Sequence, residues 1–454
     1  MLKCDLLVDS KDLRATLLKL KKDDDFTILL DMTAVDYSKF PDSTPSRFAV
    51  VYVLRSSDFK KETTVKAFVS DETLSVDTVS DIFPSANWAE REAYDQYGVI
   101  FLNHPNLKRV LNHKQFVGHP LRKDYKITQG QICTETEDLM DEMLPLLKSK
   151  GYTDEEIADL MLLNVGPSHP ASHGTIRNFV ALEGETIAAC VTEIGYLHRG
   201  FEKACEHHTY SQVIPYTDRL NYCSAILNNI GWAKAIEDMM KIEITPRAKM
   251  IRVVIGELSR IIDHFVCNAA NMVDLGGLTS LWYLFGARDQ AYDLLSKLTG
   301  ARLTNTYTRI GGLEFDLYDG FDKDLEEVLK TSEKAIEDVL SLIAHNKLFH
   351  DRTQDVGVIK PDFALANGIS GPNLRAAGVA HDLRKDKPYY GYENFDFDVV
   401  IGSHGDVYDR MMCRFEESIQ SIKIIRQAMK NMPDGAINVY APNLVLPNKK
   451  DVYG

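Results

Sequence analysis

One long amphipathic helix, predicted between Thr245 and Gly276, constrains the fold more than any other feature of the sequence. Thr245 supplies an N-cap, and Pro246 suits the first helical position. Apolar residues then recur at i, i+3, i+4 and i+7 over about six turns. These residues are Ile251, Val254, Ile255, Leu258, Ile261, Ile262, Phe265, Val266, Ala269, Ala270 and Val273. Because most helical stability comes from packing such a face, the pattern predicts neighbouring elements that cover it.

Further helical patterns flank this one. They cover residues 224–242, 278–299, 325–346 and about 406–429. Gly300 closes the second of them, and an acidic first turn opens the third, as the helix dipole favours. Four or five long antiparallel helices imply a bundle.

The first 125 residues indicate a different architecture. A short amphipathic helix over residues 9–22 is followed by strand-like runs at residues 26–35, 47–56 and 63–70. This order predicts an α+β protein that begins with a small domain built on an antiparallel sheet.

Two further boundaries follow from the pattern. Residues 126–160 are acidic and helix-compatible, and we expect them to form a linker. A second domain would occupy residues 161–454 and begin with a β-hairpin that turns at Glu183-Gly184-Glu185.

Composition excludes several function classes. The net charge of −14 and the pI near 5.4 argue against nucleic acid as a partner, because a phosphate backbone requires a basic face. The longest apolar run, Phe48 to Leu54, is far shorter than the ~20 residues that span a bilayer. The N-terminus lacks the apolar core of a signal peptide. We therefore expect any membrane association to come through a partner.

The seven cysteines are scattered. They are Cys4, Cys133, Cys190, Cys205, Cys223, Cys267 and Cys413. No CxxC pair occurs, which argues against an iron–sulfur cluster or a zinc site held by this chain, and we expect no metal ligands. The cysteines are expected to be reduced and to pack in the core. The sequence also lacks GxGxxG after a strand, a Walker A loop, HExxH and GxSxG.

Titratable side chains are densest between Asn164 and Tyr222. His169 and His173 flank a proline, and Gly174 follows, so both imidazoles are predicted on one tight turn rather than on a helical face. Asp274 ends the long helix, where a carboxylate is unfavourable at the negative end of the dipole. It either has a cationic or histidine partner or faces water.

A Gly-rich stretch between residues 351 and 405 interrupts the helical patterns. Arg375, Arg384 and Lys385 make it locally basic within an acidic chain. A long irregular connection of this kind predicts a functional or docking surface.

Several long motifs carry a resemblance to a known family. GPSHPASHGTIR, IGYLHRGFEK, HHTY, YTDRLNY, GELSRIIDH, GARLTNTYTRIGG and SGPNLRAAGVAHDLRKDKPYYGYENFDFDV occur in order. Over roughly residues 161–450 the chain resembles the D subunit of respiratory complex I, the proton-pumping NADH-quinone oxidoreductase. EREAYDQYGVIF, HPNLKRVL and GHPLRKDY resemble its C subunit. The whole chain resembles a C–D fusion.

The resemblance implies a fold and an extent. The second domain would have a helix bundle similar to the large subunit of nickel–iron hydrogenases. The family continues beyond the LPNKKDVYG at which this chain ends, so the D part would be truncated at its C-terminus.

The resemblance also implies roles for individual residues. His173 and Tyr222 would hydrogen-bond the quinone headgroup, and Asp274 would be the carboxylate that partners His173. Arg199, and His169 with it, would lie toward the terminal iron–sulfur cluster of a neighbouring subunit. A phenol and an imidazole at the carbonyl oxygens can supply protons as the quinone is reduced. The chain departs from the family at Asn221, where an Asp is usual, and at His381, where an aromatic residue is usual.

The implied cofactors and partners belong to a larger assembly. Quinone would be the substrate, no cofactor would be bound covalently, and FMN and the iron–sulfur clusters would reside on partner subunits. Those partners would include the terminal-cluster subunit and membrane-arm subunits, at the cytoplasmic side of the bacterial inner membrane. A hydrogenase would need a CxxC pair before DRLNY, which is absent. A non-catalytic scaffold or fragment and a ferredoxin-linked relative of the complex remain as alternatives.

Overall fold

The computed structural model describes residues 4–135 and 138–440. It forms two compact units. We call them the sheet unit (residues 4–56 and 62–204) and the helical unit (residues 205–454 with 1–3 and 57–61). The chain end that suggested a truncation, residues 446–454, lies outside the described residues. The domain boundaries at residues 125 and 161 stay a prediction.

The sheet unit is built on a four-stranded sheet with the order β1-β4-β3-β2. Its strands are β1 (Leu6–Asp9), β2 (Ile28–Asp36), β3 (Phe48–Arg55) and β4 (Glu62–Val69). β2, β3 and β4 are the three predicted strands, and they pair antiparallel as expected. β3 is central and buried along almost its whole length, which explains why it was the longest apolar run.

The prediction of a purely antiparallel sheet was wrong in one respect. β1 pairs parallel with β4, with Leu6 opposite Val65. This strand has only four residues and is largely exposed, so no alternation marks it in the sequence. The first helix, α1 (Leu13–Asp23), accordingly begins four residues later than predicted.

Three further elements of this domain were not predicted. Helix α2 (Ala86–Tyr97) lies over the sheet against β2, and β5 (Ser75–Asp77) pairs parallel with β6 (Ile100–Leu102). α2 buries polar residues as well as apolar ones, which obscured its pattern in the sequence. Those polar residues are Glu90, Arg91, Asp95 and Gln96.

The predicted hairpin is present and belongs to a three-stranded antiparallel sheet. Its strands are β7 (Met161–Val165), β8 (Arg177–Glu183) and β9 (Thr186–Glu193). The predicted linker contains two helices, α3 (Met140–Ser149) and α4 (Asp154–Asp159). Met143 and Leu147 of α3 join the core of this sheet, so part of the linker packs rather than serving only as a tether.

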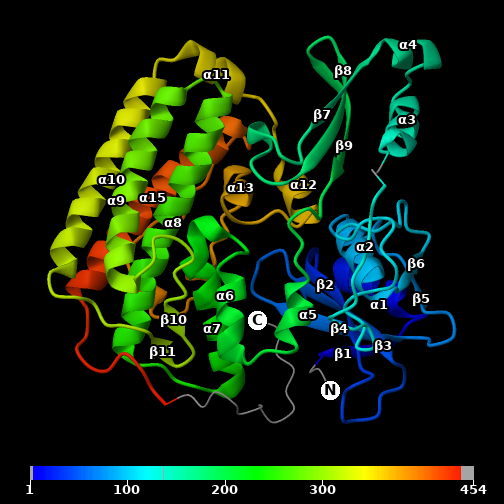
Figure 1. Cartoon of the computed structure of the whole chain (residues 1–454), viewed down its shortest axis with the longest axis horizontal. Helices are drawn as coiled ribbons and strands as arrows, with labels where there is room; N and C mark the ends of the chain where they lie inside the picture. Colours follow the sequence, from blue (N-terminus) through cyan, green and yellow to red (C-terminus); the bar gives the residue numbers. More distant parts are fainter. Residues whose placement is uncertain (1–3, 136–137, 441–454) are drawn as a thin grey trace. The chain divides into compact units, whose positions relative to one another are not determined.

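The helical unit confirms the predicted bundle. Its long helices are α7 (Ala225–Met240), α8 (Pro246–Asp274), α9 (Leu278–Thr299), α10 (Phe321–Ile343) and α15 (Val407–Lys430). α8 packs against α7, α9 and α15, and Figure 1 shows α8, α9, α10 and α15 side by side. The Thr245 side chain caps α8 by accepting from the Ala248 amide at 3.2 Å, as predicted. The apolar stripe of α8 forms the middle of the largest core cluster.

Short elements connect these helices. They are α5 (Phe201–Cys205), α6 (Tyr210–Thr217), η2 (Tyr222–Ser224), β10 (Thr308–Arg309), β11 (Gly312–Leu313), α11 (Lys347–Thr353), α12 (Pro361–Ala366), α13 (Gly371–Ala376), α14 (Leu383–Asp386) and η3 (Tyr392–Asn394). The irregular stretch over 351–405 thus consists of single turns and short helices. No helix in the described ranges has the length and apolarity needed to cross a membrane.

Candidate functional site

The two predicted histidines lie on one tight turn of the sheet unit, as the sequence indicated. The turn is the 3₁₀ helix η1 (Pro170–Ser172), with His169 as its N-cap and His173 in the left-handed region at φ 50°. His169 Nδ1 accepts from the Ala171 amide at 3.2 Å, so the exposed ring would carry its proton on Nε2. His173 is also exposed. The sequence of this turn holds both imidazoles toward solvent.

Arg199 belongs to the same unit, on the segment that joins β9 to α5. It is exposed, and the His198 amide closes a turn onto the Gly195 carbonyl at 2.9 Å beside it. The neighbouring Tyr196 and Leu197 are exposed as well. The segment therefore presents a cation beside apolar surface.

Tyr222 opens the 3₁₀ turn η2 of the helical unit, and η2 packs on α8. About half of its surface is exposed (52%), so the phenol faces outward. The preceding Asn221 side chain donates from Nδ2 to Ser224 Oγ at 2.8 Å and to Asp263 Oδ1 at 3.2 Å. Upstream of this turn, Asp218 is fully buried and accepts from the amide and hydroxyl of Thr306. Long-range contacts thus hold the turn that carries the phenol.

Asp274 is the last residue of α8, and it is exposed. It lies eleven residues beyond Asp263, the α8 contact of the Tyr222 turn, which corresponds to roughly 16 Å along the helix axis. Three apolar residues close to Asp274 in the sequence are exposed, namely Val273, Leu278 and Trp282. A small cavity of about 290 Å³ lies beside them, lined partly by Leu275, Gly276 and Leu348.

The predicted site residues are therefore divided between the units. His169, His173 and Arg199 lie in the sheet unit, and Tyr222 and Asp274 lie in the helical unit. Within the sheet unit, the two histidines share one turn. Within the helical unit, Tyr222 lies on a turn that packs against α8, and Asp274 is the last residue of α8. The two residues are therefore at different positions along this helix.

The predicted basic docking surface was wrong for its two arginines. Arg375 and Arg384 are both buried inside the helical unit. Arg375 Nε donates to Glu417 at 2.6 Å, and the other oxygen of that carboxylate faces His264 Nε2 at 2.9 Å. An arginine in a Gly-rich segment is expected to be exposed. Here both arginines are buried because they pair with carboxylates on α15 and α8.

Glu257 is the centre of a second buried charge cluster that sequence reasoning missed. Arg384 donates to it at 2.9 Å, and the hydroxyls of Tyr392 and Ser421 donate at 2.6 Å each. Burial raises the pKa of Glu257, but the charges of Arg384 and Arg260 and the two hydroxyls outweigh burial and lower it to about 2. A single acid within GELSR gave no sign of these three hydrogen-bond donors, because they lie 127 to 164 positions away.

A third buried pair fixes the segment that follows α9. Arg252 meets Glu237 through two hydrogen bonds of 2.7 and 2.8 Å. The same guanidinium donates to the carbonyls of Arg309 and Gly312. These contacts tie the TRIGG motif to α8, which makes that motif a structural one within this unit.

The expectation for the cysteines was wrong for most of them. Among the seven, only Cys413 is buried, while Cys133 and Cys190 are exposed and the others are partly exposed. All seven are free thiols. Across residues 4–135 and 138–440, no group of three or more His, Cys, Asp or Glu side chains is arranged to hold a metal ion.

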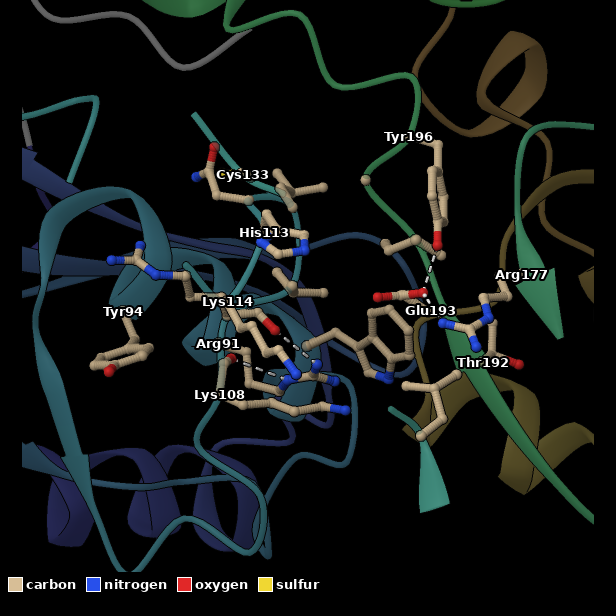
Figure 2. Close-up of a pocket in the computed structure, with 18 of the residues that line it drawn as sticks. Arg91, Tyr94, Lys108, His113, Lys114, Cys133, Arg177, Thr192, Glu193 and Tyr196 are labelled. Atoms are coloured by element: carbon tan, nitrogen blue, oxygen red, sulfur yellow. Dashed lines mark hydrogen bonds and ion pairs between the residues drawn. The ribbon is translucent and has the colours of Figure 1, made fainter. Parts of the chain in front are cut away.

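The sheet unit also contains a cavity of about 610 Å³, shown in Figure 2. The loop 107–114 lines one side, and the end of β9 with Tyr196 lines the other. Asp95 shapes that loop by accepting from three successive amides at 2.8 to 3.2 Å, those of Val110, Leu111 and Asn112.

Most cations of this cavity already face carboxylates. Lys108 pairs with Glu142, Arg109 with Asp95, and Arg177 with Glu193. Tyr196 donates to Glu193 at 2.5 Å, and burial together with this carboxylate raises the pKa of Tyr196 to about 12. These ion pairs neutralise three of the cations that line the cavity. The cavity therefore offers little net positive charge to a polyanion.

Comparison with known proteins gives the family. A family model described as respiratory-chain NADH dehydrogenase, 30 Kd subunit, matches residues 6–131, and one described as the 49 Kd subunit matches residues 274–454. The C/D subunit of NADH-quinone oxidoreductase from Bdellovibrio bacteriovorus is 47% identical, over 98% of this chain and 78% of that protein. The chain belongs to the C/D subunit family of NADH-quinone oxidoreductase.

Other members of the C/D family are more distant. Those of Psychrobacter cryohalolentis and Photorhabdus laumondii are 38% and 39% identical. The matches cover 94% and 89% of this chain, and 74% and 68% of the two relatives. The resemblance to a C–D fusion of complex I is thereby confirmed. The similarity of the fold to hydrogenase large subunits stays a prediction.

Proposed function

We propose that this chain forms much of the quinone-binding pocket of a proton-translocating NADH-quinone oxidoreductase. The observation that carries the proposal is Tyr222. This residue is about half exposed, yet the turn that bears it is joined to α8 through Asn221, and buried Asp218 upstream of the turn accepts from Thr306. A donor that faces outward from a fixed turn is suited to a ligand, because little conformational entropy is lost on binding.

The chemistry needs two electrons and two protons for each quinone reduced to quinol. FMN and iron–sulfur clusters on partner subunits would supply the electrons. On this chain, Tyr222 and His173 would donate hydrogen bonds to the two carbonyl oxygens and stabilise the negative charge that develops there. Asp274 would be the carboxylate that partners His173. Arg199, with His169 nearby, would lie on the side of the terminal cluster.

The surface around Asp274 supports a lipophilic ligand. Leu278 and Trp282 are one helical turn apart on α9 and are both exposed, and Val273 of α8 is exposed beside Asp274. Exposed apolar side chains gathered beside a carboxylate are typical of a binding surface. They suit an isoprenoid quinone or an apolar segment of a membrane-arm subunit.

The proposal extends to the whole enzyme. The chain would act as a translocase subunit only within the multisubunit complex, as a peripheral component at the cytoplasmic side of the bacterial inner membrane. Its partners would be the terminal-cluster subunit and subunits of the membrane arm.

Replacement of Tyr222 by phenylalanine tests this function. Membranes of the host carrying Tyr222→Phe would be assayed for two rates, NADH to quinone and NADH to hexacyanoferrate, which bypasses the quinone site. Loss of the phenol donor should lower the first rate by roughly 100-fold or more and leave the second unchanged. Tyr152→Phe is a matched control, because that phenol donates to Glu183 at 3.3 Å, away from the proposed site.

Two outcomes would contradict the proposal. Equal quinone rates in Tyr222→Phe and wild-type membranes would remove Tyr222 from the site and favour a scaffold. Retention of reductase activity with ferredoxin but not with NADH, in wild-type membranes, would assign the chain to a ferredoxin-linked complex.

A further inference from the structure

Asn221 directly precedes Tyr222, and its side chain carries no charge. In the structure, a carboxylate lies at this turn, because Asn221 Nδ2 donates to Asp263 Oδ1 at 3.2 Å. Asp263 is partly buried on α8, 42 residues away in sequence. The charge at this position thus comes from α8 instead of from the turn.

The contacts around this pair form a small closed set. The Asn221 amide also donates to Ser224 Oγ at 2.8 Å, and the Asn221 carbonyl accepts from Asn228 Nδ2 at 3.4 Å. Both ends of η2 are therefore tied through one side chain. If the acceptor on α8 were lost, the side-chain amide of Asn221 would keep only its contact with Ser224, and the turn would lose this hydrogen bond to α8.

Charged and titratable neighbours approach Asp263 from two other elements. Cys223 lies on η2, and its thiol pKa is raised by burial and by the charge of Asp263. Arg288 and Tyr292 lie on α9, with Arg288 Nε donating to the Tyr292 hydroxyl at 3.2 Å. The Arg288 guanidinium is the cation that acts on the same groups. Asp263 of α8 and Arg288 of α9 thus act with opposite charge on the same two groups, Cys223 and Tyr292.

We propose that Asp263 is a positioning residue for Tyr222, which it holds through Asn221 in the orientation used at the quinone. The inference rests on the proposed function. Its physical basis is complementarity: an amide at 221 donates to a carboxylate at 263. An acid at both positions would place two carboxylates about 3 Å apart, where like charges repel and no donor joins them. The two positions should therefore tolerate an exchange of the amide and the carboxylate, but not a carboxylate at both.

Exchange of the two side chains tests this prediction. Asn221→Asp duplicates the acid, and the reciprocal variant Asn221→Asp with Asp263→Asn restores one amide and one carboxylate. We expect the single variant to lower kcat for quinone reduction by roughly tenfold with KM nearly unchanged, as a misplaced donor does. The reciprocal variant should recover to within about threefold of the wild type. Asp238→Asn is the control, since Asp238 is exposed on α7 and pairs there with Lys234 at 2.7 Å.

The rate with hexacyanoferrate separates positioning from folding. A purely structural defect would lower both rates together by reducing the amount of assembled complex, and that result would overturn the proposal. A wild-type quinone rate in Asn221→Asp would overturn it as well. So would a reciprocal variant no more active than the single one.

The same variants, made with and without Tyr222→Phe, distinguish this inference from the proposed function. In a Tyr222→Phe background, Asn221→Asp should have little further effect, because both act on one phenol. If Tyr222→Phe reduces the quinone rate but the exchange does not rescue, only the role of Asp263 fails. If Tyr222→Phe has no effect, the proposed function itself fails.

Discussion

The turn of His173 and the turn of Tyr222 carry the two proposed quinone ligands, and they are built in opposite ways. Ser172 Oγ lies 2.7 Å from the carbonyls of His169 and Gly174, so the histidine turn is closed by its own residues. The tyrosine turn has one such internal contact, from Asn221 to Ser224, but it is also joined to α8 through Asp263, and Asp218 upstream of it accepts from Thr306. One turn is a property of its local sequence, whereas the other is a property of the bundle. Disturbing the bundle should therefore affect Tyr222 far more than His173.

The largest difference between the two turns is expected at low pH, which should destabilise the bundle around Tyr222 more than the turn of His173. Burial raises the pKa of Glu257 and of Glu417, but hydrogen bonds and opposite charges outweigh it and lower both to about 2, against an ordinary value of 4.5. Between these values the unfolded chain binds more protons than the folded one, so this stability is present above pH 4.5 and is lost as pH falls toward 2. The loss is on the order of 3 kcal/mol for each carboxylate.

Hydrogen exchange measured on the purified chain at pH 5 and pH 3 checks this expectation. Protection of α8 and α15 should fall at pH 3, while β8 and β9 beside the histidine turn should change less. The variant Glu257→Gln should be less stable at pH 5 and should lose part of its pH dependence. An equal fall in α8 and in β8 would contradict the comparison.

Asp218→Ala should have the next largest effect. It leaves the hydroxyl and amide of Thr306 without their buried acceptor, at a cost of about 2–3 kcal/mol in the free energy of unfolding. Urea denaturation of the purified chain, followed by tryptophan fluorescence, measures this cost. Asp319→Ala, also in the helical unit, is a surface control that should change the midpoint little. A wild-type midpoint for Asp218→Ala would show that the tyrosine turn does not depend on this contact.

Ser172→Ala should have the smallest effect. The serine hydroxyl closes a solvent-exposed turn, so its loss should cost less than about 1 kcal/mol of stability. Quinone reduction should fall by only a few-fold, because Pro170 and Gly174 still restrict the turn. The same urea and membrane assays apply. A loss as large as that of Asp218→Ala would mean that the histidine turn also depends on distant contacts.

Local patterns predicted the elements well where one residue type controls the backbone. Pro246 with Thr245 marked the start of α8, Gly300 marked the end of α9, and the Gly184 turn marked the β8–β9 hairpin. The prediction failed for β1, which is too short to alternate, and for α2, whose buried face is partly polar. In both cases the stabilising contacts lie in other segments.

For the candidate site, the sequence predicted residue types and local geometry but not their support. Motif resemblance singled out His173, Tyr222 and Asp274, and the shape of the histidine turn followed from Pro170 and Gly174. The acceptor for Asn221 could not be predicted, because one acid on α8 has no pattern that links it to a residue 42 positions away.

The sequence by itself thus determined the long helices of the bundle, the hairpin, the histidine turn and the family, because each depends on nearby residues or on ordered motifs. Tertiary structure alone decided that Arg375 and Arg384 are buried, that Glu257 gathers hydroxyls and cations, and that Asp263 lies at the turn of Tyr222. Burying a charge is favourable only when partners converge on it from several elements. That convergence is set by how the helices pack, and no local pattern encodes it.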